Sequence, residues 1–366
     1  MSFKYPVYQP TLKGNEKKYV NECLDSTWIS SKGKYVNLFE ESFSKFTTIK
    51  YSAVVSNGTV ALHLALLALG IGEGDEVIVP TFTYIASVNA ITYANAKPVF
   101  VDSDPATWQI DPSKIREKIS KKTKAIMAVH IYGHPCEMNE IIKIAKEKNL
   151  YVIEDCAEAI GTYYQNKHAG SFGDIATFSF FGNKTITTGE GGMVSTNNQK
   201  LHDLVVRLKG QGLAKGKEYF HDIIGYNYRM TNICAALGLA QLERINEILK
   251  EKDRMISEYK KNLEDIPVSY HKEVGNVKHS YWMFTILAAS ENERDKLRKY
   301  LAGNSIETRP TFHPIHTMPM YLEKSNYPVA EDLGKRGINL PSYPDLTNEN
   351  IKFITSKVSS FHNGKR

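Results

Sequence analysis

Short apolar runs alternate with helix-like segments from residue 51 to residue 195, and this alternation most constrains the fold. Helical patterns at Val60–Leu69, Ile85–Ala94 and Met138–Lys148 separate several of the apolar runs. Continuous apolar runs are typical of strands that are buried on both faces. The order therefore predicts an α/β domain with a mostly parallel central sheet. We expect its strands at Ser52–Val55, Glu76–Val79, Pro98–Val101, Ala125–His130, Tyr151–Glu154, Ile175–Phe180 and Gly192–Ser195.

The pattern changes after a helix that we predict over Ile233–Leu249. The segments that follow are a charged amphipathic stretch, a strand-like run, a helix and a Pro- and His-rich stretch, at Lys250–Lys261, Ser280–Leu287, Glu291–Leu301 and Arg309–Pro319. They indicate a smaller α+β domain. We place the large domain at residues 1–250 and the small C-terminal domain at 251–366, which leaves the N-terminal segment free to pack with the small domain.

The composition is that of a globular protein, with 366 residues, 42% of them hydrophobic, and a formal net charge of +6. No long basic run concentrates that charge, so we expect no nucleic-acid partner. The excess suits an anionic small substrate as well as an ordinary solvated surface. No apolar run reaches the roughly 20 residues needed to span a bilayer, and the N-terminus lacks the apolar core of a signal peptide. We therefore expect a soluble cytoplasmic protein without a membrane partner.

The four cysteines, Cys23, Cys136, Cys156 and Cys234, are scattered and form no CxxC pair. This spacing favours free thiols in a reducing compartment over a disulfide framework or a cysteine-based metal site. Clustered histidines near Arg309 also lack a cysteine or carboxylate partner with suitable spacing. We expect no metal.

A possible phosphate site lies at Ser56-Asn57-Gly58-Thr59, between a predicted strand and an apolar helix. The N-terminus of a helix offers free N–H groups and the positive end of the helix dipole. Gly58 permits close approach of the backbone, and Ser56 and Thr59 add hydroxyl groups. Taken alone, the motif favours ordinary helix capping.

Asp155 ends the predicted strand YVIED, where α/β sheets bind their ligands. A carboxylate there can keep a pyridinium nitrogen protonated, which makes the ring a stronger electron sink. Lys184 follows 29 residues later, just past another strand and before a glycine-rich segment. Such a lysine can act as a Schiff-base amine, and Ser179 can donate to a cofactor phosphate. Capping of a turn by Asp155 and a solvated Lys184 remain open alternatives.

Tyr84 lies in Thr81-Phe82-Thr83-Tyr84, directly after the strand that Pro80 closes. An aromatic ring at a strand end can stack on a pyridine ring, although core packing is the usual role of such residues. The four features together supply a phosphate cradle, a stacking ring, an acid for a ring nitrogen and an imine lysine. Their joint occurrence at strand ends favours a pyridoxal-phosphate enzyme.

At this point the sequence resembles the DegT/StrS sugar-nucleotide aminotransferases, which are fold-type I pyridoxal-phosphate (PLP) enzymes. The resemblance runs over nearly the whole chain. It rests on the segments SNGTVALHLALLALGIGEGDEVIVPTFTYIAS, EDCAEAIG, GDIATFSFFGNKTITTGEGG, GYNYRMTNICAALGLAQL and LPSYPDLTNE.

The resemblance implies a role for each matching residue. Lys184 would bind pyridoxal 5′-phosphate as an imine and then move the proton between substrate and cofactor, with pyridoxamine 5′-phosphate as the intermediate form. The other implied cofactor contacts are Asp155 at the ring nitrogen, Glu158 near the ring hydroxyl, Tyr84 on the ring, and Gly58, Thr59 and Ser179 at the phosphate. Many relatives carry Gln or His in place of Glu158. Asn227 would reach the phosphate from the neighbouring subunit, so a homodimer with shared active sites, and possibly a tetramer of two dimers, is implied.

The resemblance also concerns the substrate. The opening segment WISSKGKYV and the stretch RPTFHPIH match the part of the family that holds the sugar nucleotide, which implicates Trp28, Arg309 and His313. The opening block and SFFGNKTITTGEGG are most similar to members that aminate the C4 ketone of GDP-4-keto-6-deoxymannose with L-glutamate, for O-antigen or a similar polysaccharide.

Three alternatives remain open on the sequence. The acceptor could be a dTDP or UDP keto sugar aminated at C3 or C4, because small changes in the acceptor pocket decide the base. Related dehydratases act on the same GDP sugar but carry His where this chain has Lys184. A non-catalytic regulator on the same fold is disfavoured by the intact Lys184, Asp155 and phosphate loop.

Overall fold

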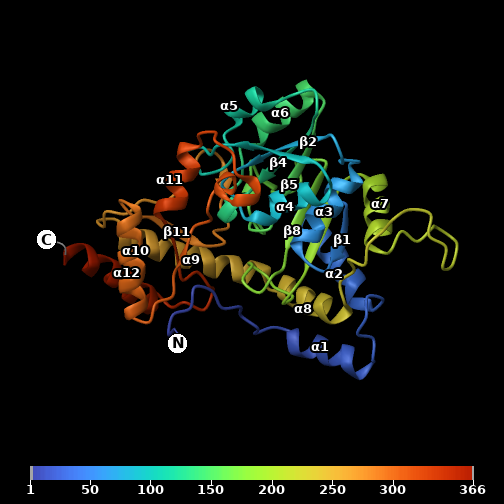
Figure 1. Cartoon of the computed structure of the whole chain (residues 1–366). Helices are drawn as coiled ribbons and strands as arrows, with labels where there is room; N and C mark the ends of the chain where they lie inside the picture. The colour runs from blue at the N-terminus through green and yellow to red at the C-terminus, as the bar shows by residue number, and fades with distance from the viewer. Residues whose placement is uncertain (1–2, 365–366) are drawn as a thin grey trace.

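The computed structural model describes residues 3–364 as a large central sheet with helices on both faces and a smaller group of C-terminal elements beside it (Figure 1). The sheet has seven strands in the order β1-β9-β8-β5-β4-β2-β3. Only β9 runs antiparallel to its neighbours; the other pairs are parallel. The predicted α/β fold with a mostly parallel sheet is therefore confirmed. The strands are β1 (Tyr51–Val55), β2 (Glu76–Pro80), β3 (Lys97–Val101), β4 (Thr123–Val129), β5 (Tyr151–Asp155), β8 (Ile175–Ser179) and β9 (Gly192–Thr196).

Alternate residues of the central strands enter different cores. On one face, Val77 and Met127 pack with helices α3 (Gly58–Ala68) and α4 (Ile85–Tyr93). On the other face, Ile78 and Ile126 pack with α6 (Met138–Lys148). Because side chains alternate across a strand, burial on both faces requires an unbroken apolar run. This requirement explains why the sequence located these strands.

The remaining α-helices divide between the large part and the C-terminal part of the molecule. Those of the large part are α1 (Glu16–Asp25), α2 (Lys34–Thr47), α5 (Pro112–Ile115), α7 (Gln199–Lys209) and α8 (Asn232–Glu243). Rings of Phe39, Phe43 and Phe180 meet at centroid distances of 5.1–6.1 Å and join α2 to the end of β8. No helix within residues 3–364 combines the length and apolar character needed to cross a bilayer.

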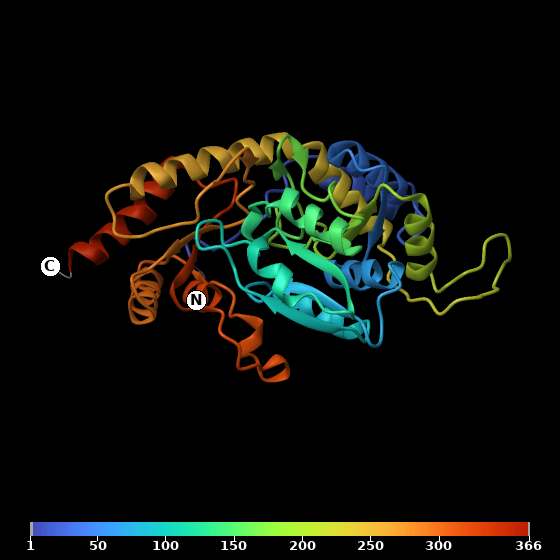
Figure 2. The ribbon, with the colours of Figure 1, turned by 90° about the horizontal axis from the view of Figure 1, so that it is seen from above.

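The C-terminal part contains a small antiparallel sheet in the order β11-β13-β12. Its strands are β11 (Phe284–Leu287), β12 (Arg309–Pro310) and β13 (Gly337–Leu340), and its helices are α9 (Ile245–Leu263), α10 (Glu291–Gly303), α11 (Pro328–Arg336) and α12 (Asn348–Asn363). A second small sheet joins β10 (Val277–Lys278), β6 (Tyr163–Tyr164) and β7 (Lys167–His168). Figure 2 shows α8 and α9 running along one side of the molecule from the N-terminal helices to α12.

Two predicted elements differ from the structure. The helix expected over Ile233–Leu249 is two helices, because Arg244 leaves helical geometry (φ −104°, ψ 10°) between α8 and α9. The strand expected over Ser280–Leu287 is shorter, because the N–H groups of Ser280 and Trp282 donate to Gly133 and Tyr132 instead of to the small sheet. This second difference brings Trp282 to the edge of the large sheet.

The division at residue 250 remains a prediction, and the first two and last two residues of its ranges lie outside the described part. Helix α9 continues through that position, from Ile245 to Leu263. The N-terminal segment packs with C-terminal elements, because the Tyr5 N–H donates to the Ser305 carbonyl and its ring joins the core with Ile306.

Candidate active site

The carboxyl ends of the parallel strands carry the polar residues of the site. Strand β5 ends at Asp155, β8 ends at Ser179, and β2 ends at Pro80, just before Tyr84. Since β2, β4, β5 and β8 are parallel neighbours, these ends lie at the same edge of the sheet.

The Asp155 carboxylate is 4% exposed and is held by two neutral donors. Its oxygens accept hydrogen bonds from the Ser87 hydroxyl at 2.8 Å and the Ala157 N–H at 3.0 Å. In the described part of the chain, neither oxygen forms an ion pair. Burial raises the pKa of Asp155, against the opposing effects of Ala157, Ser87 and the Lys184 charge. A buried carboxylate in this state favours a cationic group beside it.

Lys184 contacts Glu158, which lies three residues after Asp155. The Lys184 Nζ lies 3.3 Å from Glu158 Oε1, and both side chains are largely buried. The other Glu158 oxygen accepts the Tyr132 N–H at 2.7 Å. Burial raises the pKa of Glu158, and the Lys184 charge and the Tyr132 N–H oppose that rise. The structure thus places the predicted lysine inside the site and not on the solvated surface.

The proposed phosphate cradle lies where α3 begins. Asn57 caps the helix: its side chain accepts the Val60 N–H at 3.0 Å and its carbonyl accepts the Ala61 N–H. The first N–H groups of a helix have no partner within it, so those of Gly58 and Thr59 are left for another acceptor. A Cβ at Gly58 would lie 2.8 Å from the Ser179 Cβ. Only glycine lets these two segments come so close.

Tyr84 lies at the rim of this edge. It precedes α4 and is 56% exposed, so core packing does not account for it. Its ring centroid lies 5.4 Å from that of Phe312. Phe312 belongs to the stretch that begins at Arg309, and this stretch is fixed to the strand end by the Ile315 N–H, which donates to the Thr81 carbonyl at 2.8 Å.

The three residues expected at the sugar nucleotide are exposed, and within residues 3–364 none of them forms a hydrogen bond or ion pair with Lys184. Trp28 is 58% exposed, and among the described residues its one hydrogen bond is between its carbonyl and the Asn232 side chain. The Arg309 guanidinium pairs with Glu307 at 2.8 Å. His313 is exposed beside Phe312, so it borders the site. Their roles stay predictions.

Asn227 is exposed in the long loop between α7 and α8, which projects from the molecule (Figure 2). Its side chain accepts from the Arg229 guanidinium at 3.1 Å, and its main chain pairs with Gly210. In the described part of the chain, no contact joins Asn227 to Lys184 or Asp155. Its expected role across a subunit boundary stays a prediction.

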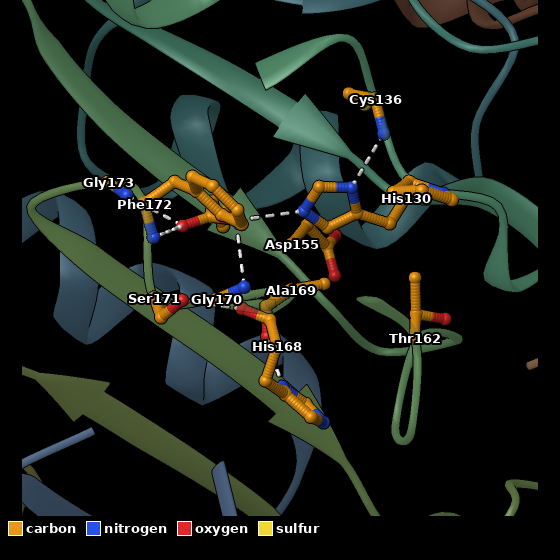
Figure 3. A network of polar contacts seen from close by, with 12 residues as sticks. His130, Cys136, Asp155, Thr162, His168, Ala169, Gly170, Ser171, Phe172 and Gly173 are labelled. Atoms are coloured by element: carbon orange, nitrogen blue, oxygen red, sulfur yellow. Dashed lines mark hydrogen bonds and ion pairs between the residues drawn. The ribbon is translucent and has the colours of Figure 1, made fainter. Parts of the chain in front are cut away.

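A buried network stands behind the site at Glu154. This carboxylate accepts the N–H groups of Gly170, Phe172 and Gly173 at 2.6–2.8 Å and His130 Nε2 at 3.1 Å; Figure 3 shows these donors converging. Burial tends to raise the pKa of Glu154, but the His130 hydrogen bond and the N–H groups outweigh it, and the pKa is lowered.

The same network includes the one group in the described residues whose geometry could suit a metal ion: His130, Glu154 and Cys156. Two of its three residues are already engaged, because the Cys136 N–H donates to His130 Nδ1 at 3.0 Å and Glu154 has four donors. We therefore interpret the group as a hydrogen-bonded support for β5. All four cysteines are free, as predicted.

Sequence reasoning missed Ser87, Tyr132 and Trp282. Ser87 lies three residues after Tyr84 in the first turn of α4, so helical spacing could have indicated it. Tyr132 and Trp282 had no local signal. The Trp282 ring nevertheless covers the Lys184 amine, with Nζ 3.9 Å from a ring centroid.

A family model for the DegT/DnrJ/EryC1/StrS aminotransferase family matches residues 10–359. The chain belongs to this family. The matched range includes every residue of the edge described above, so the resemblance inferred from the sequence is confirmed. As a member of this family, the chain is an aminotransferase.

Similar proteins match almost from end to end. A GDP-perosamine synthase from Escherichia coli is 61% identical over 361 residues, which are 98% of this chain and 99% of the relative. A GDP-perosamine synthase from Vibrio cholerae is 51% identical over 363 residues, again 98% and 99%. A solved putative sugar aminotransferase from Streptococcus pneumoniae, in its PMP form, superposes with a TM-score of 0.94 at 27% identity and covers 98% of both chains. The likeness thus includes both the large sheet and the C-terminal part.

Proposed function

We propose that this chain is a pyridoxal-phosphate-dependent aminotransferase that moves the amino group of L-glutamate to the C4 ketone of GDP-4-keto-6-deoxymannose. The products are GDP-perosamine, for O-antigen or similar polysaccharide assembly, and 2-oxoglutarate. The observation that carries the proposal is the Lys184 amine, held 3.3 Å from Glu158 beside the buried Asp155. The full-length similarity to two GDP-perosamine synthases supports the choice of acceptor.

The residues at the sheet edge fit the cofactor. Asp155 is a buried carboxylate with neutral donors only, which suits a protonated ring nitrogen. The close approach of Gly58 to Ser179 and the free N–H groups at the start of α3 suit a phosphate group. Tyr84 offers an exposed ring at the same edge. Bound there, the cofactor supplies an aldehyde that carries the amino group and a ring that accepts electrons.

Lys184 and its neighbours then do the proton chemistry. In the first half of the exchange the Lys184 amine would take the proton from the glutamate carbon that bears the amino group and deliver it to the cofactor carbon; in the second half it would move a proton in the opposite sense, from the cofactor carbon to the sugar carbon. Glu158 orients this amine through its 3.3 Å contact, and the Tyr132 N–H fixes Glu158 in turn. The largely buried position of these groups excludes water, which strengthens the electrostatic contacts.

The sugar nucleotide would lie across the exposed rim. Trp28, Arg309 and His313 are free to rearrange around it, because none is buried. The Arg309 guanidinium suits a diphosphate group. To bind one, it would release its present partner, Glu307. Asn227 would complete the phosphate site of a neighbouring subunit, so we propose a homodimer as the competent unit. A cytoplasmic location is part of the same proposal, since nucleotide sugars are made there.

Mass spectrometry of products tests the proposal. The protein is incubated with PLP, L-glutamate and, in separate reactions, GDP-, dTDP- and UDP-linked 4-keto-6-deoxy sugars. We expect an amino sugar from the GDP-linked ketone and none from a Lys184→Ala control. Preferential amination of a dTDP or UDP sugar would contradict the proposed acceptor, and loss of a sugar hydroxyl without amination would contradict the reaction.

A further inference from the structure

The peptide that carries Lys184 is held by two side chains from distant parts of the chain. The Trp282 Nε1–H donates to the Asn183 carbonyl at 2.7 Å, and the Tyr8 hydroxyl donates to the Lys184 carbonyl at 2.6 Å. Neither donor belongs to the seven-stranded sheet: Tyr8 lies in the N-terminal segment, and Trp282 precedes β11. Two consecutive carbonyl groups are thus fixed from outside the element that carries the lysine.

Trp282 also contacts the amine itself. Its ring is 5% exposed, and Lys184 Nζ lies 3.9 Å from a ring centroid. The face of an indole ring attracts an ammonium group. The Trp282 side chain therefore fixes both the main chain before Lys184 and the amine at the end of the Lys184 side chain.

Trp282, Tyr132, Glu158 and Lys184 form a closed circuit of contacts. The Trp282 N–H donates to the Tyr132 carbonyl at 2.9 Å, and the two rings stack with centroids 6.0 Å apart. The Tyr132 N–H donates to Glu158, whose other oxygen contacts Lys184. Displacement of Trp282 would therefore disturb the Lys184 amine in two ways: directly, and through Tyr132 and Glu158.

Tyr8 is anchored independently of Trp282. Burial raises the pKa of Tyr8, so its hydroxyl stays a neutral donor. The neighbouring Val7 N–H donates to Glu307 at 3.0 Å, and the Val7 carbonyl accepts the Ser342 N–H at 2.9 Å. These bonds tie the segment to the C-terminal part and deliver the hydroxyl to Lys184.

The local sequence around Lys184 does little to fix its direction. Lys184 closes a turn through its own N–H to the Phe181 carbonyl at 2.9 Å. Gly182, inside that turn, has no atom within 4 Å of where a Cβ would stand. Such a turn needs restraint from outside to hold one geometry.

We propose that Tyr8 and Trp282 are positioning residues that present the Lys184 amine to the cofactor aldehyde. The inference rests on the proposed function, because it concerns how the chain's own lysine meets that cofactor. The amine attacks the aldehyde carbon, a C=N bond forms, and the aldehyde oxygen leaves as water. The two residues favour this step by holding the amine in place.

Two ligands that differ only in the aldehyde group distinguish positioning of the Lys184 amine from a general structural role. Pyridoxal 5′-phosphate and pyridoxine 5′-phosphate share the ring and the phosphate, but only the first has the aldehyde. Dissociation constants of both are measured by equilibrium dialysis for the cofactor-free full chain, Tyr8→Phe and Trp282→Phe. Tyr259→Phe is the matched control for Tyr8, since its buried hydroxyl also donates to a carbonyl, that of Pro341 at 2.9 Å. Trp108→Phe is the control for Trp282, because Trp108 is a buried tryptophan that packs on Tyr132 and His271.

We expect Tyr8→Phe and Trp282→Phe each to weaken pyridoxal phosphate about three- to tenfold, the effect of one lost buried hydrogen bond. Pyridoxine phosphate should bind as to the wild type, and the two controls should change neither ligand. Parallel weakening of both ligands, or no weakening of either, would overturn the inference. If the wild type itself shows no preference for the aldehyde, the proposed function fails, which is a separate result.

Discussion

The hydroxyl group of Ser87 donates a hydrogen bond of 2.8 Å to the carboxylate of Asp155. Ser87 also lies 3.0 Å from the Thr83 hydroxyl, so a short polar chain runs from the rim to the buried acid. These donors are neutral, and burial leaves the pKa of Asp155 raised. The buried charge of Asp155 therefore lowers the stability of the cofactor-free protein, and a cation bound beside it can offset this loss.

Asp155→Asn should abolish most transamination and yet stabilise the cofactor-free protein at neutral pH. The amide cannot keep a ring nitrogen protonated, and we expect a loss on the order of a hundredfold in rate. The amide carries no charge to bury, and Ser87 can accept from it. Because the folded pKa of Asp155 is raised, its burial cost builds up as pH rises from the unfolded pKa of about 3.9 to the folded pKa, persists above it, and vanishes below the unfolded value. Melting curves of both proteins from pH about 4 to about 7 check this prediction. A melting temperature of Asp155→Asn below that of the wild type at neutral pH would contradict it.

Glu154→Gln should weaken the protein through the network of Figure 3. The carboxylate accepts three N–H groups and His130, two donors at each oxygen, so a Gln amide would turn its own NH₂ toward two of these donors. We expect a loss of about 1–3 kcal/mol in the free energy of unfolding, measured with urea. Glu140→Gln, at an exposed position on α6, is the control. Equal stability of the two variants would remove the structural role that we assign to Glu154.

The buried Lys252 should make the free energy of unfolding depend on pH. Within residues 3–364 it donates only to main-chain carbonyl groups, those of Trp282 at 3.2 Å and Ser342 at 3.4 Å. It is 1% exposed, and burial lowers its pKa to about 7. Between that value and the unfolded value of about 10.4, only the unfolded state binds the proton, so this group makes the free energy of unfolding rise with pH.

The Lys252→Met variant should lack this slope. Urea unfolding at pH about 6, 7.5 and 9 should show the wild type gaining stability relative to Lys252→Met as pH rises, with little relative change below the folded pKa. Lys250→Met, exposed on the same helix, should follow the wild type. A relative gain toward acid pH would show that the sign is wrong.

Mixed oligomers test the shared site. Asn227→Ala and Lys184→Ala subunits, each impaired alone, are mixed in equal amounts after dissociation. If Asn227 serves the neighbouring subunit, each mixed dimer has one intact site, and about a quarter of wild-type activity returns. If no activity returns although mass spectrometry detects mixed dimers, Asn227 does not act across the interface.

The sequence predicted the elements that depend on local patterns. Unbroken apolar runs located the strands of the central sheet because both of its faces are covered, and the strand ends then indicated Asp155 and Lys184. The break at Arg244 has no Gly or Pro to mark it, so the sequence pattern ran through it as one helix.

Contacts between distant segments could not be predicted in this way. Tyr8 and Trp282 lie 176 and 98 residues from Lys184 in sequence, and nothing in their own segments points to a lysine. Trp282 looked like part of a strand, because an apolar run does not reveal whether its N–H groups pair with a sheet or with a loop such as Tyr132–Gly133. Such partners become visible only once the chain is folded.

Borohydride reduction followed by peptide mapping tests the role of Lys184 most directly. The full chain is saturated with PLP, reduced, digested and analysed by mass spectrometry, with and without prior exposure to L-glutamate. We predict a reduced cofactor adduct on the peptide that contains Lys184, and its loss when glutamate is added first without a keto acceptor. An adduct confined to other lysines, or none at all, would contradict the assignment of Lys184 as the cofactor-binding amine.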